Sequence, residues 1–210
     1  MLEAHALGEL ELRRGGDGST TLRGRFPYGA TAVLSDGGRR GRPRKERFAP
    51  RAFAYRVESP NEDIHLLVGH DYGKPLASRG AGTLELRDGD DALTFTATIT
   101  AAIAATSHGS DALALIGAGL AVGLSPGFRI PPERAVKDAE TVEQEPDDGS
   151  PDANGDPQRG AIIRTINAAL LYELSVVTRP AFPDAQVEAR RWAPDRPAPA
   201  PARPASFRWR

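Results

Sequence analysis

The chain of 210 residues contains no cysteine, which excludes a disulfide framework, a thiolate nucleophile and a zinc–thiolate cluster. No apolar run is long enough to cross a membrane, and residues 1–16 contain acidic residues where a signal peptide has its apolar core. The net charge of -1 gives no general attraction for nucleic acid or anionic membranes. We therefore expect one domain with a real core, no membrane or nucleic-acid partner, and neither a metal nor a cofactor.

Two segments are too polar to contribute to that core. Residues 131–159 contain nine acidic and three basic residues but no Leu, Ile, Phe, Tyr or Trp, so they bury too little apolar surface to offset the entropy lost on ordering. Residues 190–210 contain five prolines, six arginines and one acidic residue, a composition typical of an extended, flexible tail. We expect a domain over residues 1–189, interrupted by a disordered acidic insertion, and a flexible basic tail.

Alternating apolar residues predict strands through most of this domain. The expected strands lie at residues 6–12, 20–26, 64–68, 83–86, 92–99, 162–168 and 170–177. Residues 88–91 (DGDD), three aspartates and a glycine, predict a hairpin between two of these strands. Residues 107–120 have the apolar spacing of a helix with Ser110 as its N-cap, and the basic, glycine-rich residues 36–45 are typical of a solvated loop.

The sequence Gly123-Leu124-Ser125-Pro126-Gly127 fits the G-x-S-x-G pattern of a nucleophile elbow. In α/β-hydrolases the residue after the serine donates its backbone N–H to the oxyanion hole, and Pro126 has no N–H. The α/β-hydrolase order also places the histidine after the serine, whereas all four histidines here precede Ser125. Ser125 is therefore either a turn residue or the nucleophile of another fold, with its base upstream.

His70 and Glu173 are the candidate partners of such a nucleophile. His70 follows the strand at 64–68 between two glycines, and His65, five residues earlier, is expected on the opposite face. Glu173 interrupts an apolar strand, where a buried carboxylate needs a partner such as histidine. Considered alone, His70 has the simpler interpretation of a surface or hydrogen-bonded histidine. Glu173 alone has the simpler interpretation of an outward-facing strand residue. Asp71 is a second candidate for orienting the histidine.

Four separated segments resemble the prohead (capsid maturation) protease family of HK97-type tailed phages, which has similar members in gene transfer agents. They are residues 46–53 (ERFAPRAF), 66–71 (LLVGHD), 123–128 (GLSPGF) and 171–181 (LYELSVVTRPA). The resemblance extends over about residues 20–187. It rests chiefly on the histidine segment and on the last of the four segments.

This resemblance implies a serine endopeptidase related in fold to the herpesvirus assemblins, mainly β, with a barrel-like core surrounded by helices. It implies His70 as general base, Ser125 as nucleophile and Glu173 as the third member of the triad. By analogy with the arginine-bearing loop of assemblins, Arg179 is the candidate that stabilises the oxyanion.

The resemblance also implies partners and a place of action. The substrates implied are the scaffolding protein, or the scaffolding segment of the capsid protein, and the protease itself. A second copy of the chain is also a candidate partner in a homodimer, although the sequence does not give the oligomeric state. The work takes place inside the procapsid, in the cytoplasm of the bacterial host.

The residues alone leave two other functions open. One is a non-catalytic capsid-assembly or scaffold-binding module on a protease-like fold, and the other is hydrolysis of small esters. The separation of the His70 and Ser125 side chains bears on this choice, because a protease needs them close to hydrogen-bond reach.

Overall fold

The computed structural model describes residues 13–38, 41–121, 123–147, 149–150 and 159–178. Within these ranges the chain forms three four-stranded sheets, here named A, B and C, and three short helices. Sheet A has the order β1 (Arg13–Arg14), β2 (Thr20–Pro27), β8 (Ala92–Ile99), β7 (Leu84–Asp88). Sheet B has the order β10 (Glu140–Gln144), β11 (Ile162–Ile166), β4 (Arg44–Phe48), β3 (Thr31–Ser35). Sheet C has the order β6 (Asp71–Ser78), β5 (His65–Val68), β12 (Leu170–Val177), β9 (Gly123–Arg129). The helices are α1 (Ala54–Val57), α2 (Ala101–Ala104) and α3 (Ser107–Gly117).

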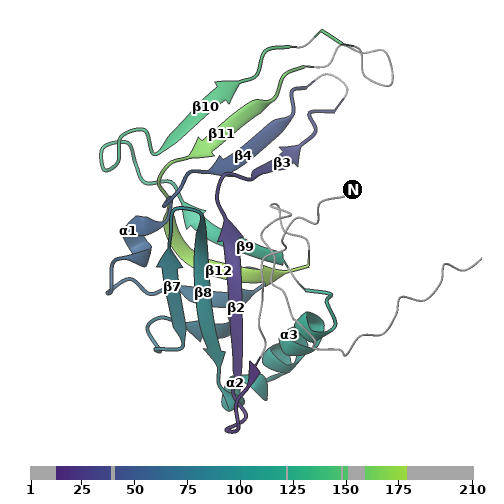
Figure 1. Cartoon of the computed structure of the whole chain (residues 1–210), viewed down its shortest axis with the longest axis vertical. Coiled ribbons are helices and arrows are strands. Elements are labelled where there is room, and N and C mark those ends of the chain that lie inside the picture. Colours follow the sequence, from purple (N-terminus) through teal and green to yellow (C-terminus); the bar gives the residue numbers. More distant parts are fainter. Residues whose placement is uncertain (1–12, 39–40, 122, 148, 151–158, 179–210) are drawn as a thin grey trace, which may run out of the picture.

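Sheets A and C enclose the main core, and sheet B extends beyond them. In Figure 1 the strands of sheet C run across behind those of sheet A, with α2 and α3 at the end of the molecule away from sheet B. Leu22 and Phe95 of sheet A and Leu66 and Leu174 of sheet C belong to one buried apolar cluster. The two sheets therefore bury their inner faces against each other, as expected for layered β folds.

The mainly β fold predicted from the sequence is confirmed, but the closed barrel is not. Among the described residues, each sheet ends in two edge strands, and none closes on itself. Strand β2 contacts β9 and β6 contacts β8, although these pairs are not hydrogen-bonded neighbours. Sheets A and C thus share a core by packing and leave their edges open.

The strongly periodic segments were predicted correctly. Strands β2, β8 and β12 and the hairpin of β7 and β8 lie where they were expected. The predicted helix is α3, but its N-cap is Thr106, whose hydroxyl accepts a hydrogen bond from the N–H of Gly109. The prediction of Ser110 as N-cap is wrong because Ser110 already lies in the first turn of the helix. The strand expected at residues 6–12 lies outside the described residues.

The disorder predicted for residues 131–159 is wrong for β10, which pairs antiparallel with β11. All five residues of β10 are exposed, so this strand needs no apolar surface of its own. It is held by backbone hydrogen bonds and by ion pairs across the sheet, including one of 2.5 Å between Arg164 and Glu140. The composition of a segment shows that it cannot form a core of its own. It does not show whether the segment pairs with a strand elsewhere in the chain. Residues 151–158 and 190–210 lie outside the described residues.

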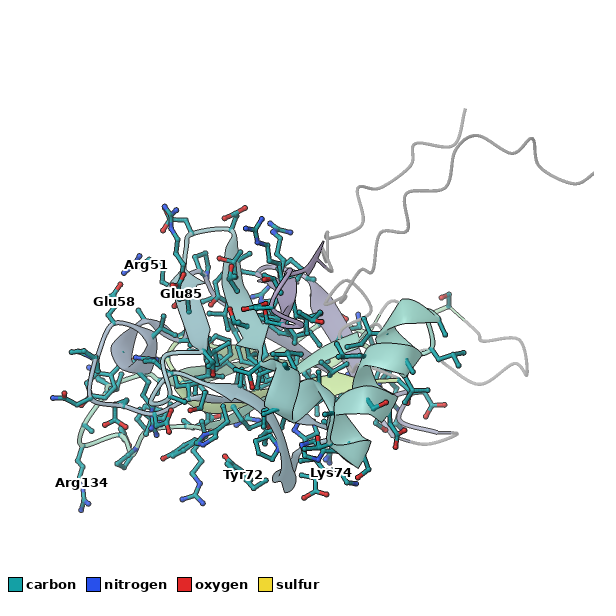
Figure 2. All side chains as sticks on the ribbon, turned by 90° about the horizontal axis from the view of Figure 1, so that it is seen from below. Arg51, Glu58, Tyr72, Lys74, Glu85 and Arg134 are labelled. Atoms are coloured by element: carbon teal, nitrogen blue, oxygen red, sulfur yellow. The ribbon has the colours of Figure 1, made fainter. Side chains whose placement is uncertain are left out.

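A buried carboxylate joins sheet A to the segment that leads into α1. Asp88, at the end of β7, is 6% exposed, and its Oδ2 accepts a 3.1 Å hydrogen bond from the N–H of Phe53. Its Oδ1 accepts a second hydrogen bond, from the hydroxyl of Tyr28. Burial raises the pKa of Asp88, and burial beside Asp88 raises the pKa of Tyr28. Next to this pair, Arg51 and Glu58 form an ion pair at the surface (Figure 2).

We predict that Asp88→Ala will lower the free energy of unfolding by about 2–4 kcal/mol, because it leaves one backbone and one side-chain donor buried without an acceptor. Urea unfolding followed by circular dichroism measures this change. Asp90→Ala, in the exposed turn that follows β7, is the control and should change stability by less than about 0.5 kcal/mol. Equal unfolding midpoints for the two variants would contradict the role of Asp88.

Candidate active site

Strand β12 positions the candidate site because it lies in the middle of sheet C. It pairs parallel with β5 and antiparallel with β9. The antiparallel register aligns Ser175 with Ser125, and Glu173 with Gly127. Aligned residues on neighbouring strands, and alternate residues on one strand, point to the same face of a sheet. Glu173, Ser175 and Ser125 therefore share one face of sheet C.

His70 reaches this face from the hairpin turn between β5 and β6. The turn consists of Gly69 and His70, with φ values of 60° and 63°. Positive φ at both residues is the geometry of a type I′ turn, which matches the twist of the flanking strands. The backbone N–H of His70 donates a 2.8 Å hydrogen bond to Ser175 Oγ, which fixes the turn over β12.

The His70 ring contacts the Glu173 carboxylate directly. The distance between His70 Nδ1 and Glu173 Oε1 is 2.6 Å, and Ser175 Oγ donates to Glu173 Oε2 at 2.8 Å. The Glu173 side chain is 5% exposed and the His70 side chain 46%. The buried carboxylate thus has a partner on each oxygen. Among the described residues, no hydrogen bond reaches the Nε2 of His70.

Ser125 lies within strand β9, so its interpretation as a turn residue is wrong. Pro126 is compatible with this strand because β9 is an edge of sheet C. Within the described part of the chain, no hydrogen bond joins Ser125 to His70. Both residues are nevertheless placed next to Ser175 of β12. Ser125 is aligned with Ser175 on the neighbouring strand β9, and the backbone N–H of His70 donates a hydrogen bond to Ser175 Oγ.

The face assigned to His65 is also corrected by the structure. Counting alternate residues placed His65 opposite His70, but β5 ends at Val68 and His70 belongs to the turn. The parallel register aligns His65 with Glu173, so both lie on the same face. Asp71, the other candidate orienter, instead binds the N–H of Gly73 at 2.8 Å, and this bond together with Lys74 lowers its pKa.

The chain matches the Caudovirus prohead serine protease family over residues 38–195. This chain belongs to that family. The resemblance inferred from the sequence is thereby confirmed, and with it the enzyme class: a serine protease of phage capsid maturation. No curated protein and no solved structure is significantly similar to the chain.

Three further features of this prohead protease family member concern membrane spans, metal sites and the candidate oxyanion residue. Among the described residues, no helix is both long and apolar enough to cross a membrane. The same ranges contain no group of three or more His, Cys, Asp or Glu side chains placed to hold a metal ion. Arg179, the candidate oxyanion residue, lies outside the described residues.

Two residues of the site were missed by sequence analysis of this protease. Ser175 is fully buried and binds both Glu173 and His70. The sequence did contain an indication of its role. Ser175 lies two residues after Glu173, so it is the second polar residue on the same face of an otherwise apolar strand. Gly127 faces Glu173, and a Cβ at Gly127 would overlap the Glu173 carboxylate. Any larger residue at that position would require the Glu173 carboxylate to move from the place where it contacts His70.

We predict that Gly127→Ala will lower peptidase activity by at least about 100-fold, because the added methyl group displaces the Glu173 carboxylate from His70. Peptide hydrolysis and circular dichroism together separate loss of activity from loss of fold. Gly117→Ala, at the end of α3, is the matched control, since its Cβ would meet nothing within 4 Å. Full activity in a folded Gly127→Ala protein would show that Glu173 is dispensable.

Ser175→Ala tests the positioning of the same pair. It removes the donor to Glu173 Oε2 and the acceptor for the His70 N–H, so we expect kcat to fall by about 10–100-fold with little change in KM. Hydrogen exchange of the His70 amide, measured by NMR, should become faster. Ser107→Ala, at the exposed start of α3, serves as the control. An unchanged kcat together with unchanged amide exchange would remove Ser175 from the site.

Proposed function

We propose that Ser125 is the nucleophile of this protease, His70 its general base and Glu173 the carboxylate that orients the base. The observation that carries this proposal is the 2.6 Å contact between His70 Nδ1 and the buried Glu173 carboxylate. In a serine protease triad the carboxylate fixes the tautomer with the proton on Nδ1, which leaves Nε2 to accept a proton from the serine. The histidine precedes the serine in the chain, but a triad is defined by geometry rather than by sequence order.

Hydrolysis then proceeds in two halves. Ser125 Oγ attacks the carbonyl carbon of the scissile peptide bond while His70 Nε2 takes the hydroxyl proton, and Glu173 stabilises the imidazolium that forms. His70 then gives this proton to the leaving amine, and an acyl group remains on Ser125. In the second half His70 takes a proton from water, the resulting hydroxide attacks the acyl carbon, and the proton returns to Ser125 as the acid leaves.

Free enzyme geometry is compatible with this mechanism. Catalytic hydrogen bonds are often long or misaligned before substrate binds, so the absence of a bond between Ser125 and His70 in the described residues does not oppose it. Pro126 provides no N–H, and we propose that residues 178–180, which include Arg179, stabilise the oxyanion instead.

The substrates we propose are the scaffolding protein or the scaffolding segment of the capsid protein, and the protease itself. Cleavage would occur inside the procapsid, in the cytoplasm of the bacterial host. Self-cleavage is proposed near residue 190, because the proline- and arginine-rich composition of residues 190–210 is typical of segments that proteases cut. The family assignment supports action in capsid maturation.

The triad makes a graded prediction for single variants. Ser125→Ala and His70→Ala should each abolish cleavage of the scaffold and of the chain itself, because triad members act as a unit. Glu173→Gln should lower kcat by about 10³–10⁴-fold and largely preserve substrate binding, since its amide favours the wrong tautomer of His70. Co-expression with the phage scaffolding protein, followed by mass spectrometry of the products, measures all three.

Ser110→Ala is the matched control, because Ser110 is an exposed hydroxyl in α3. It should process substrate at the normal rate. Normal processing by a folded Ser125→Ala protein would exclude the serine mechanism proposed here and leave a different nucleophile to be found.

A further inference from the structure

A cavity of about 380 Å³ lies along β6, the edge strand of sheet C farthest from β9. Its walls come from β5, β6, β8, α2 and the turn before β7, and include His65, Tyr72, Leu76, Thr83, Thr98 and Ile103. None of the residues that line it is Asp, Glu, Lys or Arg. None of them has a part in the hydrolysis described above.

Of the residues that line the cavity, His65 and Tyr72 lie toward the candidate active site. His65 is aligned with Glu173 in the sheet and packs edge-to-face with the Tyr72 ring, with 5.7 Å between ring centroids. Tyr72 is 58% exposed and projects outward from the molecule in Figure 2. Partial burial and, next, the charge of Glu173 raise the pKa of Tyr72.

The register also sets the distance from His65 to the nucleophile. Ser125 and His65 are separated by two strand spacings across the sheet and by two residues along it. With spacings of about 4.8 Å and 3.3 Å, their Cα atoms are about 12 Å apart. An extended peptide covers about 3.3–3.6 Å per residue, so this distance corresponds to three or four residues of a bound substrate.

The lining of the cavity favours an apolar occupant. Thr83 Oγ1 accepts from the N–H of Ser78 and donates to the Ser78 carbonyl. Thr100 Oγ1 accepts from the N–H of Ile103 at the start of α2. Because the backbone already uses these hydroxyls, the cavity offers mainly methyl and methylene groups, together with the rings at its entrance.

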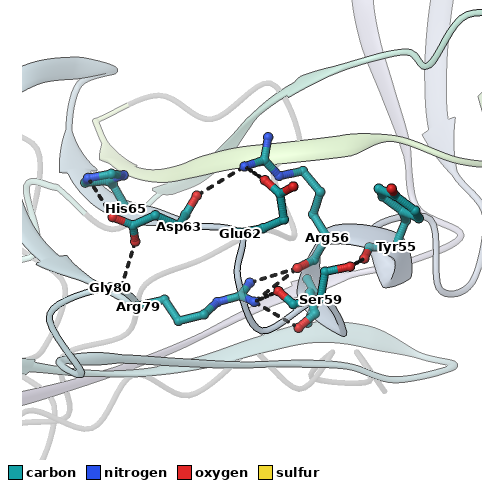
Figure 3. Close-up of polar contacts among 9 residues, drawn as sticks. Tyr55, Arg56, Ser59, Glu62, Asp63, His65, Arg79 and Gly80 are labelled. Carbon is teal, nitrogen blue, oxygen red and sulfur yellow. Dashed lines mark hydrogen bonds and ion pairs between the residues drawn. The ribbon is translucent and has the colours of Figure 1, made fainter.

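The entrance is built in advance by a polar network, drawn in Figure 3. The Asp63 carboxylate lies 3.6 Å from His65 Nε2 and accepts a 2.8 Å hydrogen bond from the N–H of Gly80. Arg79 donates to the carbonyls of Arg56 and Ser59, which holds the turn after β6 against the end of α1. The His65 wall is thereby fixed from two sides before any ligand binds.

We propose that this cavity is a specificity pocket that takes an apolar side chain of the substrate, three or four residues from the scissile bond. The inference rests on the proposed function, because it assumes that Ser125 marks the position of the scissile bond. It predicts that cleavage requires an apolar residue at one fixed distance from the bond that is cut.

The first experiment finds that position. A synthetic library of sequence-diverse 14-residue peptides is digested with the full chain, and mass spectrometry gives the residues around each cleaved bond. We expect one position, three or four residues from the bond, to be enriched in Leu, Ile, Met or Phe. Two peptides that differ only there, Leu against Ala, then give a ratio of kcat/KM values that we expect to be about 10–200.

Two variants change the size of the pocket in opposite directions. Thr98→Phe narrows it from β8 and should lower the Leu-to-Ala ratio at least about tenfold. Ile103→Ala widens it and should shift the preference from Leu toward Phe. Thr94→Phe, on the same face of β8 but outside the pocket, is the control and should leave the ratio within about twofold.

The outcomes separate this inference from the proposed triad. If Ser125→Ala abolishes cleavage but both pocket variants retain the wild-type ratio, the pocket inference is overturned and the triad stands. Binding of the same two peptides to the Ser125→Ala protein, measured by fluorescence anisotropy, is a second readout that needs no turnover. A Leu preference there that Thr98→Phe removes would support the pocket even if Ser125 were not the nucleophile, whereas equal binding of both peptides would contradict it.

Discussion

The burial of the Glu173 carboxylate is the constraint on which the candidate site depends. A carboxylate that is almost removed from water is costly unless donors replace the lost hydration. Here His70 Nδ1 supplies one donor and Ser175 Oγ the other. Gly127 is then required on the neighbouring strand, because a side chain there would occupy the space of the carboxylate. The same interaction that satisfies Glu173 gives the His70 ring a single orientation.

This constraint extends from β12 to the hairpin of β5 and β6. For the ring of His70 to reach Glu173, its backbone must occupy a two-residue turn with positive φ, a conformation that Gly69 adopts without cost and His70 does not. The bond from the His70 N–H to Ser175 helps to offset that cost. Because β6 begins directly after this turn, the strand that borders the proposed pocket is fixed relative to His70 and Glu173 by the same contacts.

The sequence predicted those elements that depend on the alternation of apolar and polar residues within one segment. Strands β2, β8 and β12 and the hairpin of β7 and β8 alternate strongly enough to be read from the sequence, and Glu173 stood out as a charge within an apolar strand. The face of His65 was missed because parity holds only while a strand continues, and β5 ends two residues before His70. Strand β10 was missed because its pairing depends on β11, whose paired residues lie 18 to 26 positions further along the chain, and not on its own composition. Gly127 became informative only once the register set it against Glu173.

The three triad candidates are positioned by two different kinds of interaction. His70 and Glu173 are joined by direct contact within one half of sheet C, whereas Ser125 is placed by the backbone ladder between β9 and β12. That ladder lies at the edge of the sheet and includes Pro126, which cannot donate a hydrogen bond. The separation of Ser125 and His70 is therefore set by the position of an edge strand, while the orientation of the His70 ring is set by its contact with the buried Glu173 carboxylate.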